Sequence, residues 1–116
     1  MALKRMVMEI GMGTDLRGED YTKAAVRALK DALWHNSLNV ADALGLSKEA
    51  MIVEVTIGVQ KPEEVNKDEV AAVLPYGQAK VIVEKGGLDI PKNYGGGLTV
   101  MVNAVATVFF DLEEAA

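Results

Sequence analysis

The stretch Gly11-Met12-Gly13-Thr14-Asp15-Leu16-Arg17-Gly18 joins an apolar run to a strongly periodic helix, and the rest of the chain is organised around it. The run before it, residues 6–10, is predicted to be a strand, and the helix is predicted to start near Glu19 or Asp20. A glycine-rich turn between a strand and a helix N-terminus brings backbone N–H groups close to a ligand. A site is therefore expected here, although the stretch specifies no reaction.

Composition restricts the class of protein. A chain of 116 residues fits a single domain, residues 1–116, and its 50% hydrophobic content indicates a packed core. A net charge of −5 disfavours nucleic-acid partners, which need a basic surface. The absence of cysteine excludes thiolate chemistry, and the single His35 excludes a multi-histidine metal site. Carboxylates could still hold Mg²⁺ or Ca²⁺, but no metal site and no cofactor are expected.

The sequence contains no candidate for membrane insertion or export. No segment approaches the roughly 20 apolar residues of a membrane span. The first eight residues lack the apolar core and cleavage site of a signal peptide. We expect a cytoplasmic protein with no membrane partner.

Hydrophobic periodicity predicts an α+β fold (an α/β sandwich) of order β-α-β-α-β-β, with a small extra helix after the first. Strands are expected at residues 4–11, 51–60, 78–85 and 98–110, and the glycine-rich segment 86–97 is expected to be a loop. Asp20 is the expected N-cap of the main helix, and Asn66 that of a short helix before Pro75. Ser37 or Asn39 is the expected cap of the extra helix. The result is a four-stranded mixed sheet with helices on one face.

Strand alternation assigns residues to the two faces of this sheet. The face expected to meet the helices carries Met8, Val53, Val55, Val81, Val83, Val102 and Ala104. The other face carries Val7, Glu9, Ile52, Glu54, Thr56, Ile82, Glu84, Met101, Asn103, Val105 and Phe109. The second set is too apolar for a solvated sheet and too charged for a dry core, and such a patch usually marks an interface. We expect a closed homo-oligomer joined by this face; the alternative is a monomer with an open, partly wet sheet.

Two resemblances follow from these residues. The pattern Gly11-x-Gly13-x-Asp15-x-Arg17-Gly18, with residues 22–27 and 51–55, resembles a small uncharacterised conserved hypothetical protein family of bacteria and plants whose signature is Gly-x-Gly-x-Asp-x-His-Gly. Arg17 stands at the histidine position, and because arginine stays protonated, a proton-carrying role is not transferred to it. The family implies no activity.

The order of elements is also weakly similar to the trimeric chorismate-mutase-like fold. Related architecture occurs in small isomerases, deaminase-like proteins and ring-opening amidohydrolases. In those proteins sheets pack around a three-fold axis and sites lie between subunits. This resemblance implies a trimer, or a multiple of one. It rests on topology and bears on fold rather than on function.

The glycine stretch has neither P-loop nor dinucleotide-binding spacing. One interpretation is a cradle for an anion at the helix start, in which Arg17 holds a carboxylate or phosphate. The other is a tight turn in which Asp15 caps backbone donors. The residues expected to bind the ligand are Gly11, Gly13, Thr14, Asp15, Arg17 and Gly18.

The catalytic candidates are Asp15, His35 and Glu54. His35 is the ordinary acid or base near neutral pH, although a lone histidine at a helix end more often caps or faces solvent. Glu54 is the carboxylate expected on the second sheet face, where an interface salt bridge with Lys80 is the alternative. The leading hypothesis is a protein or enzyme that binds a small anionic metabolite at residues 11–18, between subunits. The alternative is a non-catalytic structural or regulatory homo-oligomer.

Overall fold

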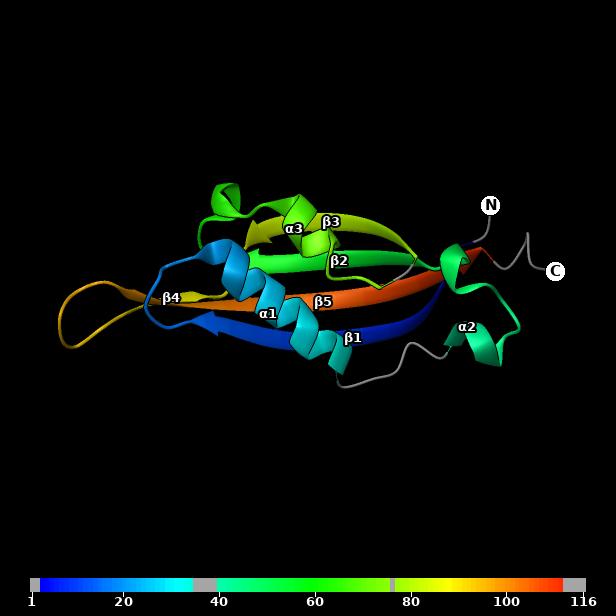
Figure 1. Ribbon diagram of the computed structural model, residues 1–116, viewed down its shortest axis with the longest axis horizontal. Helices are drawn as coiled ribbons and strands as arrows, with labels where there is room; N and C mark the ends of the chain where they lie inside the picture. Colours follow the sequence, from blue (N-terminus) through cyan, green and yellow to red (C-terminus); the bar gives the residue numbers. More distant parts are fainter. Residues whose placement is uncertain (1–2, 35–39, 76, 112–116) are drawn as a thin grey trace.

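The computed structural model describes residues 3–34, 40–75 and 77–111, and it places helices on one face of a five-stranded sheet (Figure 1). The strands are β1 (Leu3–Asp15), β2 (Ile52–Val59), β3 (Gln78–Lys85), β4 (Leu88–Pro91) and β5 (Leu98–Asp111). The helices are α1 (Tyr21–Trp34), α2 (Val40–Ala43) and α3 (Lys67–Ala71), with 3-10 turns η1 (Lys48–Ala50) and η2 (Pro62–Glu64). The α+β class is confirmed, but the prediction of four strands is wrong.

The sheet is mixed, with strand order β1-β5-β2-β3. Among the described strands, β2 and β3 run parallel, and β5 is antiparallel to β1, β2 and β4. The additional strand β4 lies within the segment predicted to be a loop, and it pairs with residues 98–101 of β5. The chain reaches that place by crossing the end of β2, where Gly87 has a φ of +59° and a Cβ would lie 2.9 Å from the Gly58 carbonyl oxygen. Side chains at this crossing would collide with β2, which explains the glycines.

The first strand faces the opposite way from the prediction. A register shift between Arg5 and Val7 changes the alternation at its start. Met8 and Ile10 are then exposed on the open face of the sheet, at 47% and 63%. The side facing the helices instead carries Glu9, Gly11, Gly13 and Asp15. Two glycines and two acids are typical of a solvated face. The residue types in this strand therefore predict the wrong buried side.

Gly11 and Gly13 belong to β1 rather than to a turn, because the strand continues to Asp15. A Cβ at Gly11 would lie 2.5 Å from the Ala28 carbonyl oxygen, and one at Gly13 would lie 2.8 Å from the carbonyl carbon of Arg27. Both partners are backbone atoms of α1, which cannot move away independently. The glycines therefore let the helix lie directly on the strand.

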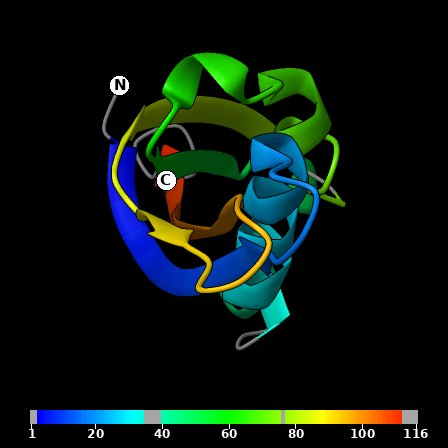
Figure 2. The ribbon, with the colours of Figure 1, turned by 90° about the vertical axis from the view of Figure 1, so that its left-hand side faces the viewer.

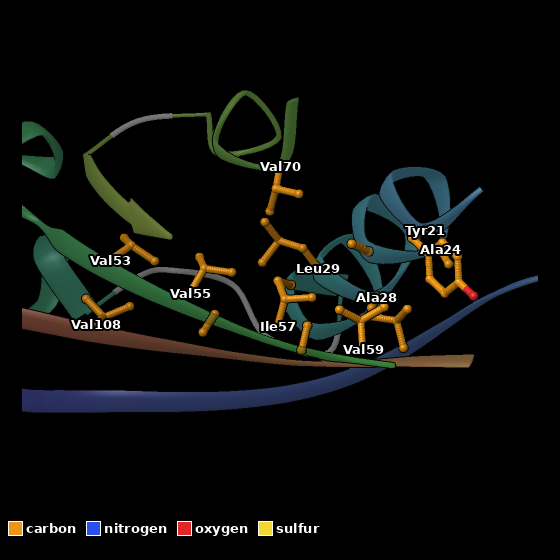
Figure 3. Packing of buried hydrophobic residues seen from close by; sticks show 14 of the residues in the cluster. Tyr21, Ala24, Ala28, Leu29, Val53, Val55, Ile57, Val59, Val70 and Val108 are labelled. Atoms are coloured by element: carbon orange, nitrogen blue, oxygen red, sulfur yellow. The ribbon is translucent and has the colours of Figure 1, made fainter. Parts of the chain in front are cut away.

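The core lies between the sheet and the helices α1 and α3. Figure 3 shows the β2 side chains pointing from the strand toward the helices, with Leu29 of α1 and Val70 of α3 above them. Leu29 and Val70 are fully buried, as are the β2 residues Val53, Val55, Ile57 and Val59.

The predicted cap of α3 is confirmed, since the Asn66 side chain accepts hydrogen bonds from the N–H groups of Asp68 and Glu69.

The molecule is elongated, with extents of 58 × 24 × 18 Å. In the view along the long axis, α1 and α3 lie on one side of a strongly twisted sheet (Figure 2). The other side, called here the open face, carries side chains that the described helices do not cover. No helix in the described ranges has the length and apolar character needed to cross a membrane.

Apolar side chains gather on one half of the open face. They come from β1, β4 and β5, and we call them the open-face strip: Met8, Ile10, Met12, Leu88, Ile90, Met101, Val105 and Phe109. Met8, Ile10, Met12, Leu88 and Ile90 are 44–63% exposed. The half over β2 and β3 carries both signs of charge, with Glu54 beside Lys80 in the parallel register and Glu84 further along.

Candidate functional site

The start of α1 is held by the side chain of Asp15, the last residue of β1. Its Oδ2 accepts a hydrogen bond from the Asp20 N–H at 2.8 Å, across the turn that contains Gly18. Asp20 in turn accepts from the Lys23 N–H with Oδ1 at 3.0 Å, as its predicted capping role requires. Two carboxylates therefore satisfy backbone donors at the helix N-terminus, where the helix dipole favours negative charge.

Asp15 is 5% exposed, and its surroundings favour the ionised form. The hydrogen bond from the Asp20 N–H is the largest influence and lowers the pKa of Asp15, while burial opposes it. The positive charges of Lys23 and Arg27 lower this pKa further. The Arg27 Nη1 lies 3.7 Å from Asp15 Oδ1 and also donates to the Thr14 carbonyl oxygen at 2.8 Å. Asp15 is thus a fixed, charged anchor between strand and helix.

A second polar contact lies beside this anchor, between Tyr21 and Asp89. The Tyr21 hydroxyl donates to Asp89 Oδ2 at 2.6 Å and joins the first turn of α1 to β4. Tyr21 is 4% exposed. Burial raises the pKa of Tyr21 well above its ordinary value, and the hydrogen bond and charge of Asp89 raise it further. The other oxygen, Asp89 Oδ1, is buried and accepts no hydrogen bond from any described residue.

Further acidic groups make this end of the molecule electronegative. Glu64 and Glu19 add to the upward shift of the Tyr21 pKa. Glu19 has a φ of +50°, and a Cβ at Gly97 would lie 3.3 Å from its Oε2, so the β4–β5 connection passes close to it. Lys61 brings one positive charge, with its Nζ 5.8 Å from the centroid of the Tyr21 ring. Such surroundings attract a cation more readily than an anion.

The predicted ligand-binding residues are distributed between two different environments. Gly11 and Gly13 lie beneath α1, and the Thr14 carbonyl is already bonded to Arg27. Arg17 and Gly18 are exposed in the turn that follows the strand. A Cβ at Gly18 would lie 2.8 Å from Asp15 Oδ2, so this glycine makes room for the capping carboxylate. Arg17 and Gly18 are thus the accessible part of the predicted cradle.

The predicted catalytic residues are not brought together. Asp15 lies on the helix-covered face opposite Val100, whereas Glu54 lies on the open face opposite Thr107. Seven residues of β5 and the thickness of the sheet separate them. His35 lies outside the described residues, as do the predicted caps Ser37 and Asn39. Among residues 3–34, 40–75 and 77–111, no three carboxylate or imidazole groups are arranged to hold a metal ion.

Several polar contacts were not predicted from the sequence, and two of them are made by the acidic residues Asp89 and Asp31. Asp89 was assigned to a loop, although the alternation Leu88-Asp89-Ile90 is the pattern of a short strand with its acid on one face. The second contact joins the Met12 N–H to Asp31 Oδ2 at 2.9 Å. No sequence signal marks it, because Asp31 lies 19 residues away from Met12 along the chain.

Comparison with known proteins places the chain among uncharacterised relatives. A family model described as "Conserved hypothetical protein (Lin0512_fam)" matches residues 5–108. A crystal structure of an FtsZ-like protein of unknown function from Nostoc punctiforme PCC 73102 is similar, with 39% sequence identity and a TM-score of 0.86. The alignment covers 95% of this chain and 98% of that one. No curated protein matches the chain.

Proposed function

The chain belongs to the conserved hypothetical protein family Lin0512_fam, which brings no activity with it, and from its geometry we propose that it works as a non-catalytic, self-assembling module. Its copies join through the open face of the sheet. The observation that carries the proposal is the open-face strip, a set of apolar side chains on three strands, interrupted on β5 by Asn103 and Thr107, that no described helix covers. Contiguous exposed apolar surface on a folded subunit marks an interaction site.

The size of the open face fits a second copy of the same chain. The strands are 13, 8, 8, 4 and 14 residues long. Each strand residue occupies about 16 Å² of the sheet plane, from the rise along a strand and the spacing between strands, so the face spans roughly 750 Å². A stable interface buries about 800 Å² on each partner. The area of the whole open face is therefore close to the area that a stable self-interface buries on each partner.

Charge on the same face also favours self-association. The strip contains no ionised side chain, whereas the neighbouring half offers Lys80 together with Glu54 and Glu84. A second copy therefore presents opposite charges as well as matching apolar surface, and such self-complementarity is typical of a symmetric interface. A trimer around a three-fold axis, as in the chorismate-mutase-like fold, is the alternative assembly that the order of elements favours, and in it the open face would be shared between two neighbouring copies.

The proposal is tested by placing a charge in the strip. We expect Ile10→Lys and Val105→Lys to reduce the mass in solution to the 12.4 kDa of one chain while the circular dichroism spectrum stays native. Leu44→Lys is the matched control, because Leu44 is an exposed apolar residue (44%) outside the sheet. Light scattering after gel filtration measures the mass. A wild-type mass of one chain at micromolar concentration would contradict the proposal.

A second candidate function is the binding of a small anionic ligand at the turn after β1. The exposed guanidinium of Arg17 favours it, because a planar fork of donors suits a carboxylate or phosphate. The carboxylates of Asp15, Glu19 and Asp20 oppose it, and Asp15 already occupies the helix N-terminus. The turn is therefore a weaker basis for a function than the open face.

Calorimetric titration with phosphate and small dicarboxylates tests this second function. If the turn binds anions, Arg17→Ala abolishes binding and leaves the thermal midpoint almost unchanged. Equal binding by wild type and variant, or none by either at millimolar ligand, would leave the turn as a structural element. Turnover of a bound metabolite would be required to make the protein an enzyme.

A further inference from the structure

The outer edge of β1 determines in which direction copies of this chain can add to one another. β1 is the terminal strand in the order β1-β5-β2-β3, so one of its sides has no strand partner among the described residues. A long strand edge offers unpaired N–H and C=O groups to a strand of another molecule. At 13 residues, β1 is long enough to propagate a sheet from one copy to the next.

Two side chains of α1 occupy that edge. The Met12 N–H donates to Asp31 Oδ2 at 2.9 Å, and the Thr14 carbonyl oxygen accepts from Arg27 Nη1 at 2.8 Å. Arg27 and Asp31 are four residues apart, so they project from the same side of the helix. One donor and one acceptor on the outer edge are therefore already satisfied within the chain.

The rest of the edge offers little to a partner strand. In an antiparallel ladder the outward-facing residues alternate, so Met8 and Ile10 follow Met12 and Thr14 along the outer side. Beyond Met8 the register shifts between Arg5 and Val7, and such bulges disrupt pairing. Met8 and Ile10 are then the two outward residues at which neither backbone group is engaged by α1, and two residues are fewer than an ordinary strand pairing uses. The opposite edge of the sheet, β3, carries the exposed charges of Lys80, Glu84 and Lys85.

We propose that Arg27 and Asp31 close the outer edge of β1 against strand pairing with a second copy of this chain, so that copies join face to face and not edge to edge. The inference deepens the proposed assembly, because it limits a face-joined oligomer to a closed size. Without these two side chains the outward residues Met8, Ile10, Met12 and Thr14 form one continuous edge.

The test compares two double variants of the full chain. Arg27→Ala with Asp31→Ala removes both contacts, and its mass should grow severalfold beyond the wild-type assembly as concentration rises, with an added intermolecular strand band in the infrared spectrum. Arg27→Lys with Asp31→Asn keeps a donor and an acceptor at the same places and should hold the wild-type mass. A folded alanine variant with the wild-type mass at every concentration would overturn the inference.

Amide hydrogen exchange provides an independent test of the closed edge if the double alanine variant does not fold. In wild type the Met12 amide should exchange slowly, and in the single variant Asp31→Ala it should exchange about fivefold faster, as the loss of one hydrogen bond implies. Equal rates in the two proteins would contradict the closing of the edge. The two proposals can fail separately. If wild type is a monomer and the mass of the double alanine variant still rises with concentration, the closed edge is supported and the face-joined oligomer is overturned.

Discussion

The covered and open faces of the sheet are built from alternate residues of the same strands, yet they are packed in opposite ways. On the covered face α1 lies so close to β1 that only hydrogen atoms fit at Gly11 and Gly13. On the open face the neighbouring residues Met8, Ile10 and Met12 extend 47–63% exposed side chains toward no described helix. Small residues thus line the contact between strand and helix within the chain, and large apolar residues line the face that we propose a second copy covers.

This contrast makes the covered face intolerant of added volume. We expect Gly13→Ala to destabilise the fold by about 3 kcal/mol or more, because its Cβ would meet the backbone of α1 at 2.8 Å, and overpacking against atoms that cannot move is the severe case. Urea unfolding measures the change. Met12→Ala, one residue earlier on the open face, is the control and should alter subunit stability far less. Similar losses in the two variants would contradict the assignment of faces.

The covered face should also be sensitive to lost volume. Val55 is fully buried on β2, so Val55→Ala should lower the free energy of unfolding by roughly 1–3 kcal/mol. Thr56→Ala, on the half-exposed open side of the same strand, should change it by less than about 0.5 kcal/mol when measured on the dissociated subunit. Thermal or urea unfolding compares them. A neutral Val55→Ala would mean that the core does not depend on this strand.

The anchor between β1 and α1 should have a smaller effect that depends on pH. Asp15→Ala should destabilise the fold by about 1–2 kcal/mol at neutral pH, since it removes the cap on the Asp20 N–H. Because the folded pKa of Asp15 is lowered from 3.8, the stabilisation is fully present above 3.8 and is lost as the pH falls through the lowered value. In urea unfolding, the difference in the free energy of unfolding between wild type and Asp15→Ala should therefore shrink as the pH falls from neutral to acidic. A constant difference across that range would show that the carboxylate charge is not involved.

The Tyr21–Asp89 contact should give the smallest change. Tyr21→Phe should cost about 1 kcal/mol at neutral pH by removing one buried hydrogen bond. Because the folded pKa of Tyr21 is raised above 10.0, wild type should lose stability as the pH rises beyond 10.0, and this variant should lose less. Tyr94→Phe, at a 90% exposed tyrosine, is the control for unfolding at alkaline pH. Identical alkaline profiles for wild type and Tyr21→Phe would exclude the raised pKa.

The sequence predicts correctly the faces of those strands whose side chains alternate clearly between the buried and the half-exposed side. β2 and β5 alternate between buried and half-exposed positions as expected, because their covered residues are large enough to produce a periodic signal. β1 was assigned backwards, because its covered positions are glycines that have no side chain and acids whose partners come from α1. The close packing of α1 on β1 depends on the tertiary structure, and no local sequence pattern predicts it.

The polar contacts of the candidate site also divide into local contacts, which the sequence predicts, and long-range contacts, which it does not. The capping roles of Asp15 and Asp20 could be predicted from local rules for helix starts, and both are present. The partners Asp89 and Asp31 could not, since they come from segments 68 and 19 residues away along the chain. Long-range polar pairs depend on the packing of the whole sheet, which sequence periodicity does not specify.

The central claim, that a second copy covers the open face, can be measured directly because the chain has no cysteine. Single variants Ile10→Cys and Leu44→Cys place one thiol each at sites that are 63% and 44% exposed in the subunit. Their rates of alkylation by a maleimide, measured at micromolar protein, report which site is covered. The account predicts that Ile10→Cys reacts many times more slowly than Leu44→Cys and catches up when the protein is diluted to dissociation. Equally fast reaction of the two thiols at every concentration would contradict it.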